Sequence, residues 1–147
     1  MSMPVSATVT SSLKEKFDNL DLKSTFAIVF SARKRVKPKV FYDFADFIKM
    51  PEKDLATLLN LSARTINNYK KSHRLLEPVY SEHLLKLIAL YLKGEEIFGN
   101  VGEFNYWLQK PFWNSKKNER PLDWLITPGG VDLVGEELDR LAHSYPA

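Results

Sequence analysis

The sequence predicts an all-α protein, with a helix-turn-helix bundle followed by a small helical domain, and three observations support this. Apolar residues recur at three- and four-residue spacing, as at Phe41, Phe44, Ala45 and Ile48. Pro and Gly stand where such helices would begin or end. No segment sustains the apolar–polar alternation of a half-buried strand.

The composition is that of an ordinary globular protein. The 147 residues are 44% hydrophobic and 27% charged, which allows one domain or two small ones and argues against global disorder. The absence of cysteine excludes disulfides and thiolate metal sites and fits a reducing compartment. No apolar run is long enough to span a membrane, and the first residues lack a signal-peptide pattern. We therefore expect a cytoplasmic protein.

The net charge of +3 conceals an asymmetry along the chain. Residues 1–94 contain 16 Lys and Arg against 9 Asp and Glu, a net charge of +7, whereas residues 95–147 contain 5 against 9, a net charge of −4. A basic first half is typical of proteins that bind a polyanion such as nucleic acid. Two solvated surfaces without partners would give the same counts.

The first 38 residues carry weaker signals. Residues 1–12 have no apolar period and are expected to form a mobile arm. The apolar positions Leu13, Phe17 and Leu20, and then Phe26, Val29 and Phe30, fit a helix or a pair of helices. The run 26–30 also fits a strand, because it is rich in β-branched and aromatic residues. The basic segment 33–39 is interpreted as a solvated linker in preference to a phosphate contact.

Clear helix signals follow Pro38. A first helix ends near Pro51, and a second carries Leu55, Leu58 and Leu59. Asn60 tolerates the left-handed conformation of a turn, and Ser62 is a good N-cap for a third helix that runs to about Lys71. A fourth, long helix opens at Glu77-Pro78 and is expected to end at Gly94.

Residues 51–71 have the pattern of a helix-turn-helix. Ala56 is small where two helices would cross, Leu61 lies under the turn, and Ile66 is placed to pack onto Leu55 and Leu59. The third helix would then present its outer face to a DNA major groove. The predicted DNA-binding residues are Ser62, Arg64, Thr65, Asn67, Asn68, Lys70 and Lys71. Because one such unit reads only a half-site, we expect a homodimer.

The C-terminal segment is rich in aromatic residues. It reads as short helices separated by Gly and Pro, with a last helix that starts at Thr127-Pro128 and buries Val131, Val134, Leu138 and Leu141. Most of the aromatic side chains belong in a core. Phe112-Trp113 are harder to bury beside a polar loop, which is typical of an interaction surface.

Four short motifs occur here in a fixed order. They are Phe98-Gly99, Trp107-Leu108-Gln109-Lys110-Pro111, Pro121-Leu122-Asp123-Trp124-Leu125, and Gly130 to Leu141. With the preceding helix-turn-helix, this order resembles the Xre/MbcA/ParS-like antitoxins, the partners of RES-domain toxins, over about 100 residues from Phe41 to Leu141. The chain departs from the family pattern at 114–119 and at Asn67-Asn68, so loop geometry and operator sequence do not carry over.

The resemblance implies an antitoxin of a type II toxin–antitoxin system. It would neutralise an NAD⁺-consuming RES-domain toxin by binding at the active-site entrance and would repress its own operon, as a homodimer within a larger hetero-oligomer. The residues implied in toxin binding are Trp113, Arg140, His143, Ser144 and Tyr145. The implied organisation is an arm (1–12), an Xre-like DNA-binding domain (13–93) and a toxin-binding domain (94–147).

The sequence gives little support for catalysis. His73, His83 and His143 are scattered without a second ligand at metal-binding spacing, and no Ser or Thr has a nucleophile-elbow setting. We therefore expect neither enzyme activity nor a metal or cofactor. The alternative function is a stand-alone dimeric helix-turn-helix repressor, which would bind DNA without a toxin partner.

Overall fold

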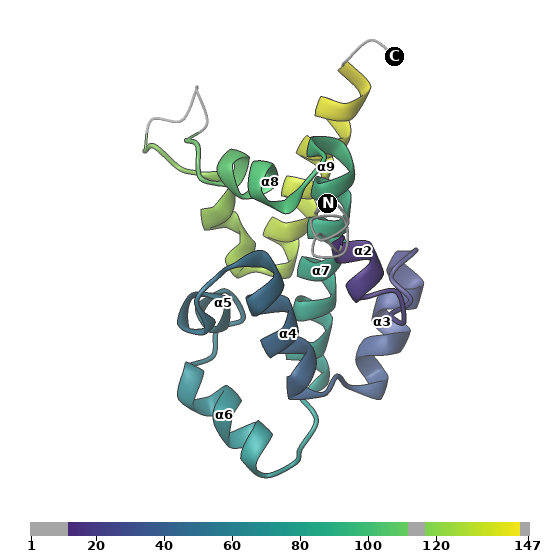
Figure 1. Ribbon diagram of the computed structural model, residues 1–147, viewed down its shortest axis with the longest axis vertical. Helices are drawn as coiled ribbons and strands as arrows, with labels where there is room; N and C mark the ends of the chain where they lie inside the picture. Colours follow the sequence, from purple (N-terminus) through teal and green to yellow (C-terminus); the bar gives the residue numbers. More distant parts are fainter. Residues whose placement is uncertain (1–11, 112–116, 145–147) are drawn as a thin grey trace, which may run out of the picture.

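The computed structural model describes residues 12–111 and 117–144, and this part of the chain is helical without a strand, as predicted. The elements are α2 (Leu13–Lys16), α3 (Thr25–Lys34), α4 (Pro38–Ile48), α5 (Glu52–Leu58), α6 (Ala63–Lys71), α7 (Pro78–Phe98), α8 (Val101–Leu108), the 3₁₀ helix η1 (Pro121–Ile126) and α9 (Pro128–Ser144). Figure 1 shows them arranged around α7, with α6 at one end and the end of α9 at the other.

Helix α7 is the central element. It contacts α2, α3, α8 and α9, and its buried side chains point to more than one side of the helix. They include Leu84, Leu85, Leu87 and Ile88, all fully buried. A helix that is apolar on several sides is stable only when other elements surround it, so α7 fixes the positions of its neighbours.

The expectation that α7 ends at Gly94 is wrong. Gly94 is buried inside the helix, which continues to Phe98 and ends at Gly99, where φ is +94°. The ring of Phe104 on α8 lies directly over Gly94, and a Cβ at this position would come within 2.4 Å of it. The glycine therefore marks a close approach of α8 to α7 and does not mark a helix end.

An aromatic cluster joins α4, α7 and α8. Tyr91 packs edge-on against Phe44, with ring centroids 5.3 Å apart, and against Phe104, at 4.9 Å. The Tyr91 hydroxyl donates a hydrogen bond of 2.8 Å to Oδ1 of Asn105, and burial raises its pKa. Edge-to-face ring pairs are favourable beyond the apolar area they bury. The cluster therefore joins the helix-turn-helix side of the molecule to its C-terminal elements.

Residues 26–30 form part of helix α3, so the strand alternative is wrong. Ile28 and Ala32 are the buried residues of α3 and face α7, whereas Phe26, Val29 and Phe30 are exposed. Upstream, the short helix α2 is held to α7 because the Glu95 carboxylate accepts hydrogen bonds from the backbone N–H groups of Leu13 and Lys14.

The basic segment 33–39 is not a solvated linker: it contains the end of α3, an ordered connection over residues 35–37 and the start of α4. Val36 is buried, its N–H donates to Oγ of Ser81, and its carbonyl accepts from the N–H of Leu76. The guanidinium of Arg35 donates to the carbonyls of Leu75 and Leu76. These bonds join the end of α3 to the loop that follows α6.

The C-terminal helix α9 runs parallel to α7. Two ion pairs bridge the helices at equal spacing, from Lys86 to Asp132 at 2.8 Å and from Lys93 to Asp139 at 2.9 Å. The predicted boundary between residues 93 and 94 falls within α7, and the division of the chain into an arm and two domains stays a prediction.

We expect Gly94→Ala to lower the free energy of unfolding by about 1–3 kcal/mol, because the new methyl group overlaps the Phe104 ring. Gly135 is the matched control: it also lies inside a helix, and its added Cβ would make ordinary contacts with Leu90 and Lys93. Gly135→Ala should stabilise the protein by about 0.5–1 kcal/mol. Urea denaturation measures both changes, and a Gly94→Ala protein as stable as the parent would contradict this reading.

Candidate functional site

Helices α5 and α6 form the helix-turn-helix that the sequence predicts. Leu55, Ala56, Leu59 and Ile66 are buried between the helices and against the rest of the core. Asn60 occupies the left-handed region with φ of +62°, as expected for the turn. The helices contact each other, and α6 lies at the end of the molecule farthest from the tip of α9 (Figure 1).

The N-terminus of α6 is fixed by a side-chain cap. Oγ of Ser62 accepts a hydrogen bond of 3.0 Å from the backbone N–H of Thr65 and lies 2.9 Å from the Thr65 hydroxyl. Both predicted DNA-binding hydroxyls are thus engaged in the cap, although Ser62 remains exposed. Other free N–H groups of the first turn point outward, where they suit a phosphate.

The outward face of α6 consists of Arg64, Asn67, Asn68 and Lys71. Ile66 and Tyr69 are the buried residues of the helix, and helical geometry places these four on the opposite side. Asn67 is half-buried at the edge of this face, and the other three are exposed. The structure therefore brings four of the seven predicted DNA-binding residues together on one surface.

Lys70 lies at the flank of α6. Its Nζ is 4.9 Å from the ring centroid of Tyr42 on α4, a cation–π contact that holds the side chain beside α4. Within the described residues, Arg64 and Lys71 form no ion pair. These two cations are therefore available to an external anion.

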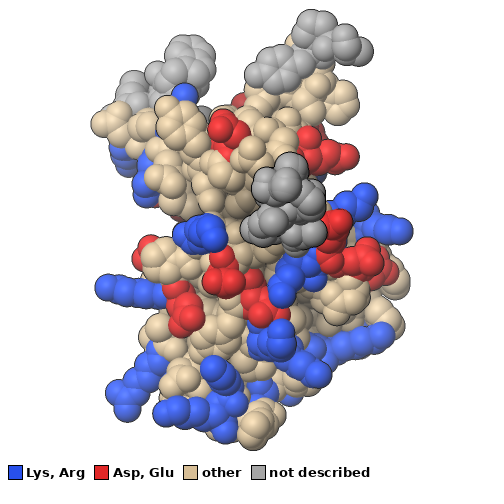
Figure 2. Space-filling view, in the orientation of Figure 1, with Lys and Arg blue, Asp and Glu red and all other residues tan. Residues whose placement is uncertain are grey.

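Positive charge extends from α6 to the end of α3. We call this surface the basic edge. Its exposed members are Arg33, Lys34, Lys37, Arg64, Lys70, Lys71 and Arg74. No Asp or Glu occurs between Asp54 and Glu77 in the sequence. Figure 2 shows this separation of charge on the surface. The blue Lys and Arg side chains gather at the lower end, around α6, and the red carboxylates lie above them.

Three hydrogen bonds connect α4, the turn of the helix-turn-helix and α7 to the C-terminal elements. The amide Nδ2 of Asn60 donates to the carbonyl of Ile126 at 2.9 Å, and Nδ2 of Asn105 donates to the carbonyl of Ile48 at 3.0 Å. Nε2 of His83 lies 2.8 Å from the carbonyl of Leu125. Because a carbonyl oxygen can only accept, Nε2–H of His83 donates this bond, and burial lowers the pKa of the ring. These links join segments 42–66 residues apart, and the sequence gives no signal for them.

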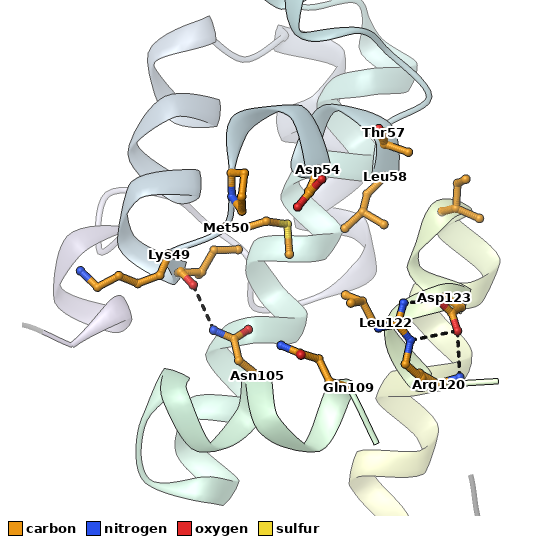
Figure 3. A pocket seen from close by; sticks show the side chains of 13 residues that line it. Lys49, Met50, Asp54, Thr57, Leu58, Asn105, Gln109, Arg120, Leu122 and Asp123 are labelled. Carbon is orange, nitrogen blue, oxygen red and sulfur yellow. Dashed lines mark hydrogen bonds and ion pairs between the residues drawn. The ribbon is translucent and has the colours of Figure 1, made fainter. Parts of the chain in front are cut away.

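A cleft of about 550 Å³ lies beside these links, between α5 on one side and α8 and η1 on the other. Figure 3 shows Met50, Asp54, Thr57 and Leu58 facing Asn105, Gln109, Arg120, Leu122 and Asp123. Arg120 and Asp123 are paired at 2.7 Å across the first turn of η1, which lowers the pKa of Asp123. The cleft is also lined by Lys49 and Asp54, so its two cations and two carboxylates balance in formal charge.

The residues implied in toxin binding lie at the end of α9, which projects beyond the other helices in Figure 1. Arg140 is exposed and pairs with Glu137, and this pairing raises the pKa of Arg140. Nδ1 of His143 bonds to the carbonyl of Asp139, and the Ser144 hydroxyl donates to the carbonyl of Leu141. Trp113 and Tyr145 lie outside the described residues.

Residues 28–89 match the family described as the antitoxin Xre-like helix-turn-helix domain. The chain carries an Xre-like helix-turn-helix domain. The match runs from α3 into α7 and includes α5 and α6 with every predicted DNA-binding residue.

The Xre-like domain supports a DNA-binding antitoxin or repressor. The matched segment stops before α8, η1 and α9, so it does not bear on the partner of these elements. No curated protein matches the chain. In the described residues, no helix has the length and apolar character needed to cross a membrane, and no three His, Asp or Glu side chains converge as metal ligands.

We expect Ser62→Ala to lower the free energy of unfolding by about 1 kcal/mol, because the N–H of Thr65 loses its acceptor at the start of α6. Ser62→Asp keeps a capping oxygen and should remain within a few tenths of a kcal/mol of the parent. Chemical denaturation compares the two variants. An equal loss in both would show that the cap does not stabilise α6.

Proposed function

We propose that this protein is the antitoxin of a type II toxin–antitoxin system, that it represses its own operon, and that it neutralises an NAD⁺-consuming RES-domain toxin. The observation that carries the proposal is the position of an Xre-like helix-turn-helix at one end of α7, with an exposed helix tip at the other end. On this proposal the protein acts in the cytoplasm by binding and has no catalytic activity of its own.

DNA recognition is assigned to the outward face of α6. Arg64 can pair bidentately with guanine, the amides of Asn67 and Asn68 with adenine, and Lys71 with a phosphate. Lys70 is held beside α4 by Tyr42 and suits the DNA backbone at the flank of the groove. Ser62 and Thr65 would act through the helix N-terminus that they cap.

Toxin binding is assigned to the tip of α9, with Arg140, His143 and Ser144 and, outside the described residues, Trp113 and Tyr145. This assignment follows from the resemblance of the C-terminal motifs to the Xre/MbcA/ParS-like antitoxins. The exposure of Arg140, His143 and Ser144 supports it, because a partner can reach all three without unfolding α9. Arg140 would exchange its intrahelical partner Glu137 for an acidic group of the toxin.

The proposal includes a homodimer, since a single α6 reads one half-site and two half-sites lie roughly 34 Å apart on a duplex. Two toxin-binding tips in each dimer would then place the dimer inside a larger hetero-oligomer.

Arg64→Ala should weaken binding to the promoter by about 1–3 kcal/mol and much less to an unrelated duplex, if Arg64 contacts a base. Lys71→Ala is the matched control from the same face. It should weaken binding to both duplexes and reduce the slope of log K against log salt concentration by about one. Fluorescence anisotropy titrations at several salt concentrations distinguish these effects. Unchanged promoter binding by Arg64→Ala would remove this residue from the recognition face.

Deletion of residues 143–147 should abolish toxin neutralisation while promoter binding persists, because the end of α9, from which the deletion starts, lies far from α6. Arg140→Ala should weaken neutralisation, and Glu137→Gln, which frees Arg140 from its partner, should not. Growth assays with the co-expressed toxin provide the measurement. Full neutralisation by the truncated chain would refute the assignment to the α9 tip.

The decisive experiment is co-expression with the protein encoded beside this gene, followed by tandem purification and an NAD⁺ assay. A stable complex, with toxicity and NAD⁺ loss only in the absence of this chain, is the expected result. DNA binding without a complex or toxicity would instead establish the stand-alone repressor.

A further inference from the structure

Helix α3 presents an apolar face to solvent. Phe26 is 77% exposed, Phe30 is 49% exposed and Val29 is 37% exposed. The rings of Phe26 and Phe30 stack with centroids 6.0 Å apart, and Nζ of Lys34 lies 4.7 Å from the centroid of Phe30. Ile28 and Ala32 hold the opposite face of α3 against α7. Exposed aromatic residues grouped in this way are typical of a protein interface.

This face is continuous with the basic edge. Arg33 lies seven residues after Phe26 on the same stripe of α3, and Arg33 and Lys34 belong to the basic edge. Arg35 and Val36 join this end of α3 to the loop after α6 through their bonds to Leu75 and Leu76. The apolar face therefore borders the surface that is proposed to bind DNA.

We propose that the exposed face of α3 is the seam of the homodimer, with α3 of a second copy as its occupant; this inference rests on the proposed DNA-binding function. Both α6 helices must face the same duplex, so the two-fold axis runs toward the DNA. Helix α3 runs toward the α6 end of the molecule (Figure 1). The two copies of α3 are therefore parallel, and Phe26, Phe30 and Arg33 each meet their own counterpart.

The seam explains why the basic charge continues to α3. Side by side, two such protomers form one basic strip that runs from one α6 across the axis to the other. The cations of α3 then lie over the DNA between the half-sites, where phosphates neutralise them.

The seam is small and is flanked by like charges. The exposed parts of the two rings and the valine amount to roughly 300 Å² per protomer, taking ~200 Å² for a phenylalanine, against ~800 Å² in a standard interface. Arg33 and Lys34 would also face their counterparts in free solution. The dimer is therefore weak in solution, and the two protomers bind DNA cooperatively.

Cysteine cross-linking tests the seam in the absence of DNA. The natural chain contains no cysteine, so any disulfide must form between the introduced residues. Phe26→Cys, Phe30→Cys and Arg33→Cys would be oxidised separately at high protein concentration and high salt. All three should form covalent dimers. Tyr106→Cys, at a position that is 63% exposed on α8, is the control and should not. Cross-linking of Phe30→Cys alone would indicate antiparallel helices and overturn the proposal, as would no cross-linking above the control.

Promoter binding gives an independent test on the folded chain. The probe is the duplex upstream of the protein's own gene. The parent and Tyr106→Glu should bind it with sigmoidal curves, and Phe26→Glu should bind non-cooperatively with a roughly tenfold higher half-saturating concentration. Identical curves for Phe26→Glu and the parent would overturn the seam and leave DNA binding intact. A parent chain that does not bind this duplex would refute the proposed function, and cross-linking would then decide the seam alone.

Discussion

The burial of α7 on several sides is the constraint on which the rest of the structure depends. Its apolar side chains cannot be covered by one neighbour, so α3, α8 and α9 pack around it and α2 is capped onto it by Glu95. The aromatic cluster centred on Tyr91 adds α4. Gly94 allows α8 to approach α7 closely, since any side chain there would displace the ring of Phe104. One helix thus sets the position of the DNA-reading end and of the C-terminal end together.

Local signals in the sequence were sufficient to predict most of the fold. Ser62 and Thr127 cap α6 and α9 as expected, Pro78 opens α7, and Asn60 forms the left-handed turn. The predicted helix end at Gly94 is wrong because a glycine that permits a close helix crossing looks the same in sequence as one that ends a helix. In α3 the apolar period identified the helix but not its buried side, because Ile28 and Ala32 face α7 and the larger phenylalanines remain outside.

The candidate site was predictable only in part, because some of its contacts join segments that are distant in sequence. The position of α6 in a helix-turn-helix followed from its turn and cap, which are local, and the outward face followed from helical geometry. The cation–π contact of Lys70 with Tyr42, and the bonds of Asn60 and His83 to η1, depend on segments that are distant in sequence. The spacing of residue types along the sequence does not predict contacts between such distant residues. Arg35 is a similar case, because it lies in a segment interpreted as a solvated linker, whereas its guanidinium fixes the loop after α6.

The length of α7 has a steric consequence. Its 21 residues span about 30 Å at 1.5 Å per residue, and α9 runs beside it and extends farther. A protein bound at the tip of α9 would therefore be separated from a duplex bound at α6 by at least the length of α7. On the proposed function, a bulky toxin at one end would not collide with DNA at the other, and α7 would act as a spacer that permits a ternary assembly.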